Sequence, residues 1–262
     1  MTPAGEPLRV TIFPDERALA KSLALHVAAQ LRENPRLVLG LPTGRTPIRL
    51  YRELVALYSS GDADFSLATT FNLDEFAGVQ PSDPGSYRTF MEQHLFGHVN
   101  LAKERVHVLN GAAGDLEAEC ARYEREIASV GGIDLQLLGI GTNGHIGFNE
   151  PAPALIARTH KVELKAETRR SNASLFGGDV DRVPREALSM GMATILHARR
   201  IILIATGKSK APAVRRMVTG PITPRLPASF LELHGDVDLW LDGAAAGQLP
   251  EGPPATSPSA AP

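Results

Sequence analysis

Short apolar runs alternate along the chain with longer amphipathic stretches. The apolar runs have the length and composition of strands buried in a parallel sheet, and the amphipathic stretches have the period of helices. Predicted strands cover residues 8–13, 36–41, 67–73, 105–110, 133–141, 158–164 and 199–207. Predicted helices cover residues 15–34, 46–60, 85–98, 115–130, 183–198 and 208–219. This alternation predicts an α/β fold: a doubly wound, mainly parallel sheet with helices on both faces, in a single domain.

The two ends of the chain depart from this pattern. Residues 1–7 precede the first predicted strand, and we expect them to be flexible. Residues 243–262 are rich in Pro, Ala, Ser and Gly, a composition that predicts disorder. Residues 8–242 then form the domain, with Asp15, Thr46 and Asp115 as expected capping residues at three helix starts.

The amino-acid composition excludes several classes of binding partner and cofactor. The chain has 27 Lys and Arg against 29 Asp and Glu, spread along its length, so nucleic acid is not an expected partner. Its single cysteine, Cys120, excludes a disulfide framework and a zinc knuckle. No apolar run approaches the roughly 20 residues that cross a bilayer, and no signal-peptide pattern begins the chain. We therefore expect a cytoplasmic protein without a membrane partner.

In a doubly wound sheet, ligands bind where the carboxyl ends of the strands meet helix N-termini. The first notable loop there reads LGLPTGRTP and contains Thr43, Gly44, Arg45 and Thr46. Its hydroxyl groups and the free amides of the next helix predict a phosphate seat, to which Arg45 could add a charged contact. Capping by Thr46 and a turn at Gly44 would also explain these residues in an isolated loop.

The second loop, ATTFNLDEF, places Asp74 and Glu75 directly after a buried run. A partly desolvated Asp at a strand end could act as a base on a carbon acid, because burial raises its pKa. Acidic pairs after strands are more often solvated turn residues. This loop alone therefore supports only a weak hypothesis.

The third loop, LLGIGTNGHIGFNEP, is the most specific. Gly139, Gly141 and Gly144 match the dinucleotide fingerprint, but Gly147 and Pro151 break the helix that the fingerprint requires. A nicotinamide or flavin enzyme is therefore not favoured.

Its polar residues suggest proton transfer instead. The imidazole of His145 titrates near neutrality and could move a proton between sugar oxygens. Glu150 could orient the ring, and Asn143 could hydrogen-bond either the ring or a sugar hydroxyl.

Together these loops resemble the glucosamine-6-phosphate deaminases, also called glucosamine-6-phosphate isomerases. The resemblance runs from the first strand to about Asp242, through LGLPTGRTP, FNLDEF, SYRTFM, GIGTNGHIGFNEP, ETRRSNASLF, VPREALSMG and ATGKSK. It implies conversion of glucosamine-6-phosphate and water to fructose-6-phosphate and ammonia, with no metal or organic cofactor.

The resemblance also implies roles for single residues. Asp74 becomes the enolisation base and His145 the ring-opening residue, with Asn143 and Glu150 as its partners. The implied phosphate contacts are the turn formed by Thr43, Gly44, Arg45 and Thr46, together with Arg169 and Lys210.

Two positions depart from the family pattern. Arg45 stands where many members have Gly or Ser, and Asn143 where Asp is common. Allosteric members bind N-acetylglucosamine-6-phosphate through basic residues after the NEP segment and through a C-terminal helix. Here residues 157–164 read ARTHKVEL, with the acidic Glu163, and the tail is predicted to be disordered, so we expect no such activation. The sequence leaves open a homo-oligomer.

Three alternatives remain to be weighed. A 6-phosphogluconolactonase shares the fold but would not need Asp74 or the NEP segment. A galactosamine-6-phosphate deaminase would use the same residues. A non-catalytic sugar-phosphate sensor would be expected to carry a DNA-binding segment and a broken catalytic set, and the chain shows neither pattern.

Overall fold

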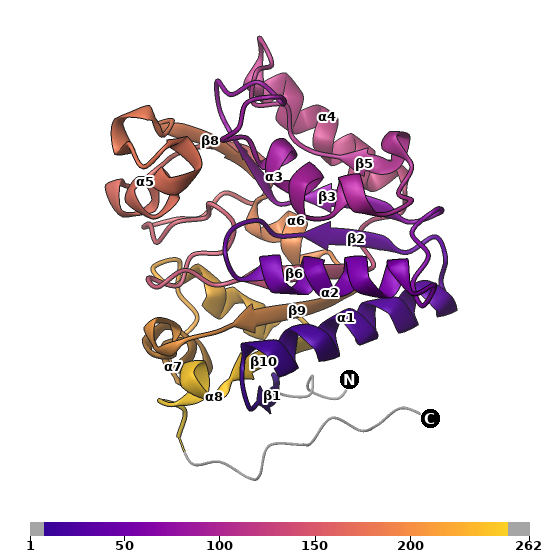
Figure 1. Ribbon diagram of the computed structural model, residues 1–262. Coiled ribbons are helices and arrows are strands. Elements are labelled where there is room, and N and C mark those ends of the chain that lie inside the picture. Colours follow the sequence, from indigo (N-terminus) through magenta and orange to yellow (C-terminus); the bar gives the residue numbers. More distant parts are fainter. Residues whose placement is uncertain (1–7, 251–262) are drawn as a thin grey trace, which may run out of the picture.

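The computed structural model describes residues 8–250, and its main feature is a central parallel sheet (Figure 1). The strands of this sheet are β1 (Arg9–Phe13), β2 (Val38–Leu41), β3 (Thr69–Asn72), β5 (Val106–His107), β6 (Leu135–Gly139), β9 (Arg200–Ala205) and β10 (Val237–Asp242). Their order is β1-β10-β9-β6-β2-β3-β5, and every pairing is parallel. The predicted α/β fold with a mainly parallel sheet in a single domain is confirmed.

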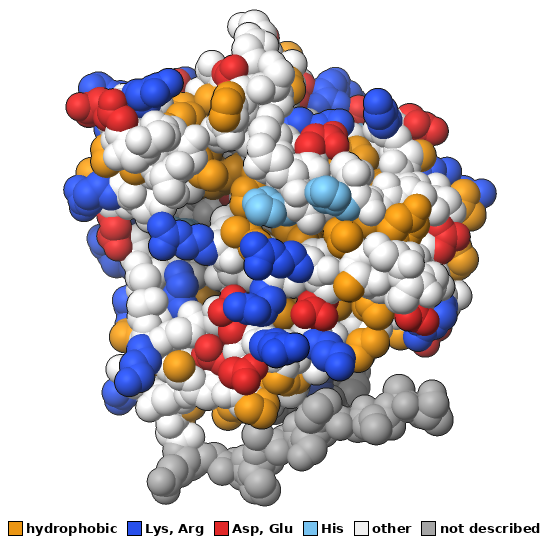
Figure 2. All heavy atoms as spheres, viewed as in Figure 1, with side chains coloured by type: hydrophobic (Ala, Val, Ile, Leu, Met, Phe, Trp, Pro, Cys, Tyr) orange, Lys and Arg blue, Asp and Glu red, His pale blue; other side chains and the backbone are white. Residues whose placement is uncertain are grey.

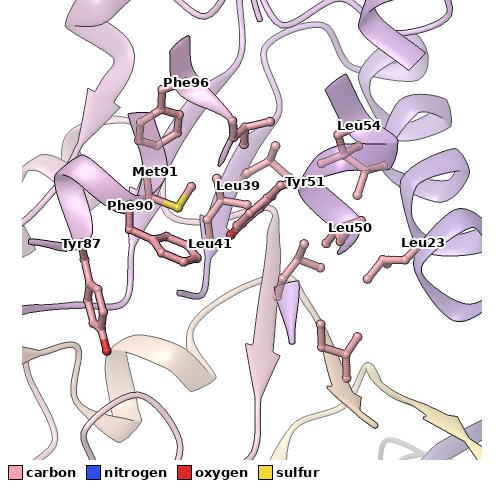
Figure 3. Packing of buried hydrophobic residues seen from close by; sticks show 14 of the residues in the cluster. Leu23, Leu39, Leu41, Leu50, Tyr51, Leu54, Tyr87, Phe90, Met91 and Phe96 are labelled. Carbon is pink, nitrogen blue, oxygen red and sulfur yellow. The ribbon is translucent and has the colours of Figure 1, made fainter. Parts of the chain in front are cut away.

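Helices cover both faces of this sheet and enclose two apolar cores. They are α1 (Glu16–Glu33), α2 (Pro47–Ser59), α3 (Tyr87–His94), α4 (Leu116–Ser129), α6 (Met192–Leu196), α7 (Ala211–Thr219) and α8 (Gly243–Ala246). Alternate strand residues point to opposite faces, so Leu39 and Leu41 pack with α1 to α3 and Val38 packs with α4, α6 and α7. Figure 3 shows Leu39 and Leu41 against Tyr51 and Phe90 in the first core.

A second, smaller sheet was not expected. It consists of β4 (Asp74–Phe76), β8 (Glu186–Ser189) and β7 (His160–Glu163) in the order β4-β8-β7, and both pairings are antiparallel. β8 occupies part of the predicted helix 183–198, so that prediction is wrong except at α6. Tertiary contacts make this segment a strand. Ala187 and Leu188 are fully buried on opposite faces of β8, one in each apolar core. Adjacent side chains on a helix point only about 100° apart, so a helix could not place the two on opposite faces.

Two of the three expected helix caps are present. Asp15 accepts a hydrogen bond from the Ala18 amide at 2.8 Å, and Asp115 accepts from two amides of α4. Thr46 makes no side-chain capping bond. Its hydroxyl therefore stays available to the space above α2.

The predicted start of the disordered tail, at residue 243, is too early in the sequence. Residues 243–246 form α8, capped by Asp242, whose carboxylate accepts the Ala245 amide at 2.7 Å. Ala245 is fully buried, because α8 packs against α7 and β10. The predicted flexible residues 1–7, and residues 251–262 of the predicted tail, lie outside the described residues. Within residues 8–250, no helix is long and apolar enough to span a membrane.

Candidate functional site

A cavity of about 940 Å³ opens where the carboxyl ends of β2, β3, β6 and β9 meet. It lies at the junction of β6 and β2, from which the chain winds outward in both directions along the sheet. All three loops singled out in the sequence line it. Lys and Arg side chains gather on the left of the face shown in Figure 2, and the strands of Figure 1 point toward the same side. The cavity combines the predicted loops with three basic side chains, and its charged lining residues are Arg45, Arg170, Lys210, Glu16, Asp74 and Glu167.

The phosphate-seat loop connects β2 to α2. Thr43, Gly44, Arg45 and Thr46 all line the cavity. Gly44 has a φ of +94°, a left-handed conformation that glycine adopts without strain. Because Thr46 does not cap α2, its hydroxyl is free to hold an anion at the N-terminus of the helix. Arg45 is exposed at the edge of this seat.

Asp74 lies at the base of the cavity, just after β3. It pairs with Ser189 across the small sheet and is only 5% exposed. Burial, with a smaller contribution from the charge of Glu75, raises the pKa of Asp74 to about 8. The Thr43 hydroxyl donates to Asp74 Oδ1 at 3.4 Å and opposes that shift. Asp74 is thus a buried carboxyl that could exchange a proton near neutral pH.

Glu75 points to the face of β4 opposite Asp74, where it is hydrogen-bonded to the backbone. Its carboxylate accepts from the backbone amides of Phe76, Tyr87 and Arg88 at 2.8, 2.9 and 3.0 Å. Two of these amides belong to the N-terminus of α3, where a negative charge is stabilised by the helix dipole. Of the two adjacent carboxyls, only Asp74 lines the cavity.

The histidine loop follows β6 and folds back on itself. Gly141 donates its amide to the His145 carbonyl at 2.9 Å, and Asn143 Oδ1 accepts the His145 amide at 3.1 Å. A Cβ on Gly141 would lie 2.3 Å from the imidazole, so only glycine lets the ring pack there. Gly147 has a φ of +57°, and a Cβ there would lie 3.1 Å from Ser189 Oγ and 3.6 Å from Asp74 Oδ2. The glycines of this loop bring His145 and Asp74 to one cavity.

Glu150 lies behind the imidazole and is 6% exposed. Its Oε2 is 3.7 Å from His145 Nδ1 and accepts a hydrogen bond from Asn143 Nδ2 at 2.9 Å. Its Oε1 accepts from the hydroxyl of Thr168, on helix α5 (Ala166–Asn172). Burial lowers the pKa of His145, and the negative charge of Glu150 opposes that effect. The imidazole is therefore neutral near pH 7 and faces a carboxylate.

The two predicted cationic contacts have different surroundings. Lys210 lines the cavity at the start of α7, where burial lowers its pKa. Arg169 does not line it: its guanidinium donates to the carbonyls of Val183 at 3.1 Å and Val180 at 2.7 Å. The next residue, Arg170, lines the cavity instead.

Sequence reasoning missed three residues at the site. Thr168 and Arg170 flank the predicted Arg169 within ETRRSN, so the motif contained the signal. Tyr87 is stacked on Phe148 at the cavity, and its hydroxyl donates to Asn172 at 3.2 Å. Nothing in the sequence alone distinguished Tyr87 from a core aromatic residue.

The arrangement can bind an anion at one side and move protons at the other. Among residues 8–250, no three His, Cys, Asp or Glu side chains lie together in a way that could hold a metal ion. Asp74 and His145, which line this cavity, are side chains of the kind that act in general acid and base catalysis.

Comparison with known proteins agrees with this geometry. A model of the family described as glucosamine-6-phosphate isomerases/6-phosphogluconolactonase matches residues 14–240. A protein of Halothermothrix orenii named glucosamine-6-phosphate deaminase is 50% identical over 92% of this chain and 100% of its own length. One of Rhodopirellula baltica with the same name is 50% identical over 92% of this chain and 96% of its own.

Solved structures extend the comparison. A monomeric glucosamine-6-phosphate deaminase superimposes with a TM-score of 0.89 at 45% identity, covering 92% of this chain and 100% of that one. A 6-phosphogluconolactonase from Trypanosoma cruzi reaches a TM-score of 0.73 at 20% identity, covering 94% and 98% of the two chains, which shows a shared fold. The chain therefore belongs to the family of glucosamine-6-phosphate isomerases and 6-phosphogluconolactonases.

Proposed function

We propose that the chain is a glucosamine-6-phosphate deaminase, which converts glucosamine-6-phosphate and water to fructose-6-phosphate and ammonia. One observation carries the proposal: a buried carboxyl, Asp74, and a neutral imidazole, His145, line the same cavity as an anion seat. A lactonase would need no base on carbon. The names of relatives about 50% identical over nearly their whole length support the same choice.

Binding begins at the phosphate. The free amides of α2, the hydroxyls of Thr43 and Thr46, and Lys210 surround a position suited to a phosphate monoester. Arg45 and Arg170 add positive charge at the cavity. We assign no phosphate contact to Arg169, because backbone carbonyls occupy its guanidinium.

Ring opening is assigned to His145. The neutral imidazole accepts the proton of the C1 hydroxyl and returns a proton to the ring oxygen, which opens the hemiacetal. Glu150 stabilises the imidazolium that forms in between, since its Oε2 lies 3.7 Å from Nδ1. Asn143 fixes both the His145 backbone and the Glu150 carboxylate.

Isomerisation is assigned to Asp74. As a carboxylate it removes the proton from C2 of the open chain, and as a carboxylic acid it delivers the proton to C1. The resulting imine at C2 adds water and loses ammonia, leaving fructose-6-phosphate. These steps transfer only protons and water, so the proposal includes no metal and no organic cofactor.

The experiment that tests this function measures products from three substrates. Purified protein is incubated with glucosamine-6-phosphate, galactosamine-6-phosphate or 6-phosphogluconolactone, and ammonia and ketose phosphate are quantified. We expect equimolar ammonia and fructose-6-phosphate from the glucosamine ester. Hydrolysis of the lactone without release of ammonia from either amino sugar would overturn the proposal. A preference for galactosamine-6-phosphate would instead assign that epimer as the substrate.

The raised pKa of Asp74 predicts the acid limb of the pH profile. Only the carboxylate can remove the C2 proton, so kcat/KM should rise about tenfold per pH unit below about pH 8 and level off above it. Burial lowers the pKa of His145, so its titration does not account for a limb near pH 8. The measurement is kcat/KM between pH 6 and 9. Binding of the unreactive glucose-6-phosphate over the same range separates substrate ionisation, and a flat kcat/KM profile would contradict the assignment.

Regulation and location are also proposed. We expect hyperbolic kinetics without activation by N-acetylglucosamine-6-phosphate, because the acidic Glu163 stands among the basic residues of the segment 157–164. The solved deaminase that resembles this chain is described as monomeric, which supports a monomer over the homo-oligomer that the sequence left open. The one cysteine, Cys120, is buried and free, and a cytoplasmic location suits a chain without disulfides.

A further inference from the structure

Helix α5 covers the cavity and is tied to the rest of the protein by polar contacts. The Thr142 hydroxyl donates to Glu167 at 3.2 Å, and the Tyr87 hydroxyl donates to Asn172 at 3.2 Å. Thr168, however, is the one buried residue of α5, at 3% exposure. A helix that packed only for stability would be expected to bury an apolar side chain at such a position.

The buried hydroxyl of Thr168 has a single side-chain partner, the catalytic carboxylate. It donates to Glu150 Oε1, while Asn143 donates to Oε2. The two donors come from different segments, and together they occupy both oxygens of Glu150. Asn143 lies in the same loop as Glu150, whereas Thr168 lies on a separate helix. The orientation of Glu150 toward His145 therefore depends on where α5 sits.

We propose that Thr168 is a positioning residue for proton transfer: by holding Glu150 against His145, it makes ring opening depend on the placement of α5 over the cavity. The inference rests on the proposed function. Helix α5 then controls the orientation of the Glu150 carboxylate. Oε2 of Glu150 lies 3.7 Å from His145 Nδ1, just beyond the range of a direct hydrogen bond. A small rotation of Glu150 decides whether that contact forms.

Several charged groups act on His145, and Thr168 affects only one of them. Glu150 and Glu167 favour the imidazolium, whereas Lys210 and Lys165 disfavour it. Glu167 and Lys165 lie on or beside α5, and Lys210 follows β9. Removing the Thr168 hydroxyl leaves these other groups in place while weakening the hold on Glu150.

The test compares Thr168→Val, which keeps the shape and removes the hydroxyl, with Thr168→Ser, which keeps the hydroxyl. We expect the valine variant to lose about tenfold in kcat with KM within about twofold of wild type, and the serine variant to stay close to wild type. In a Glu150→Gln background, the same valine substitution should have almost no further effect.

Each outcome decides the proposal. Equal loss in the valine and serine variants, a change confined to KM, or an additive loss on Glu150→Gln would overturn it. A readout independent of turnover is the NMR titration of the His145 imidazole. We expect a lower pKa for His145 in Thr168→Val than in wild type and Thr168→Ser, since Glu150 no longer stabilises the charged ring. An unchanged His145 pKa in folded protein would overturn the inference, whereas absence of ammonia release by wild type would refute only the proposed function.

Discussion

Replacement of Asp74 by asparagine is expected to lower kcat for ammonia release by about 10³- to 10⁴-fold, the upper part of the range for a general base. Asparagine keeps the size of the side chain and can still accept from the Thr43 hydroxyl, but it cannot take a proton from C2. The loss corresponds to about 4 to 5.5 kcal/mol of activation free energy. Turnover is measured with saturating glucosamine-6-phosphate at pH 8.

The matched control is Asp62→Asn, an exposed aspartate after α2 whose carboxylate accepts a hydrogen bond from the Ser60 hydroxyl. This variant should retain wild-type turnover. Binding of glucose-6-phosphate to Asp74→Asn should also be unchanged within a few fold, because the phosphate seat is intact. Full turnover by the Asp74→Asn variant would remove Asp74 from the mechanism, whatever the reaction.

His145→Gln is expected to lower kcat by about 10²- to 10³-fold. The amide can hydrogen-bond the sugar oxygens but cannot carry a proton between them. The loss should be smaller than for Asp74→Asn, because sugars also open without catalysis and the remaining base can then act on the open chain. Steady-state turnover at pH 8 measures the effect.

The comparison variant here is His98→Gln, at an exposed position where the ring contacts the Gln93 carbonyl. It should behave as wild type. A further test separates the two catalytic steps: deuterium at C2 should slow wild type but have a smaller effect on His145→Gln, where ring opening limits the rate. A wild-type rate for His145→Gln would show that another group opens the ring.

The sequence predicted every strand of the central sheet except β10, because most of these strands are short apolar runs buried on both faces. β9 is an almost uninterrupted apolar run, and nearly every residue in it is buried. Such a short apolar run is typical of a strand inside a parallel sheet. The loops after β2, β3 and β6 then follow from topology, since parallel strands bring their carboxyl ends to one edge. Asp74 and His145 could be predicted to meet for this reason.

The small sheet and α5 could not be predicted in the same way. Residues 186–189 have helix-forming composition, and only pairing with β4 and β7 makes them a strand. The conformation of residues 166–172 likewise decides which of Arg169 and Arg170 lines the cavity. Adjacent residues on a helix point about 100° apart, so a motif can locate the pair without choosing between its members.

The end of β10 affects the cavity from a distance. Asp242 accepts the Gly207 amide on both oxygens, at 3.1 and 3.0 Å, and also caps α8. Gly207 begins the segment that carries Lys210, so a side chain near the carboxyl end of the domain anchors the cationic wall of the anion seat. Shortening the protein to just before Asp242 would therefore weaken substrate capture as well as packing, even though none of residues 242–250 lines the cavity.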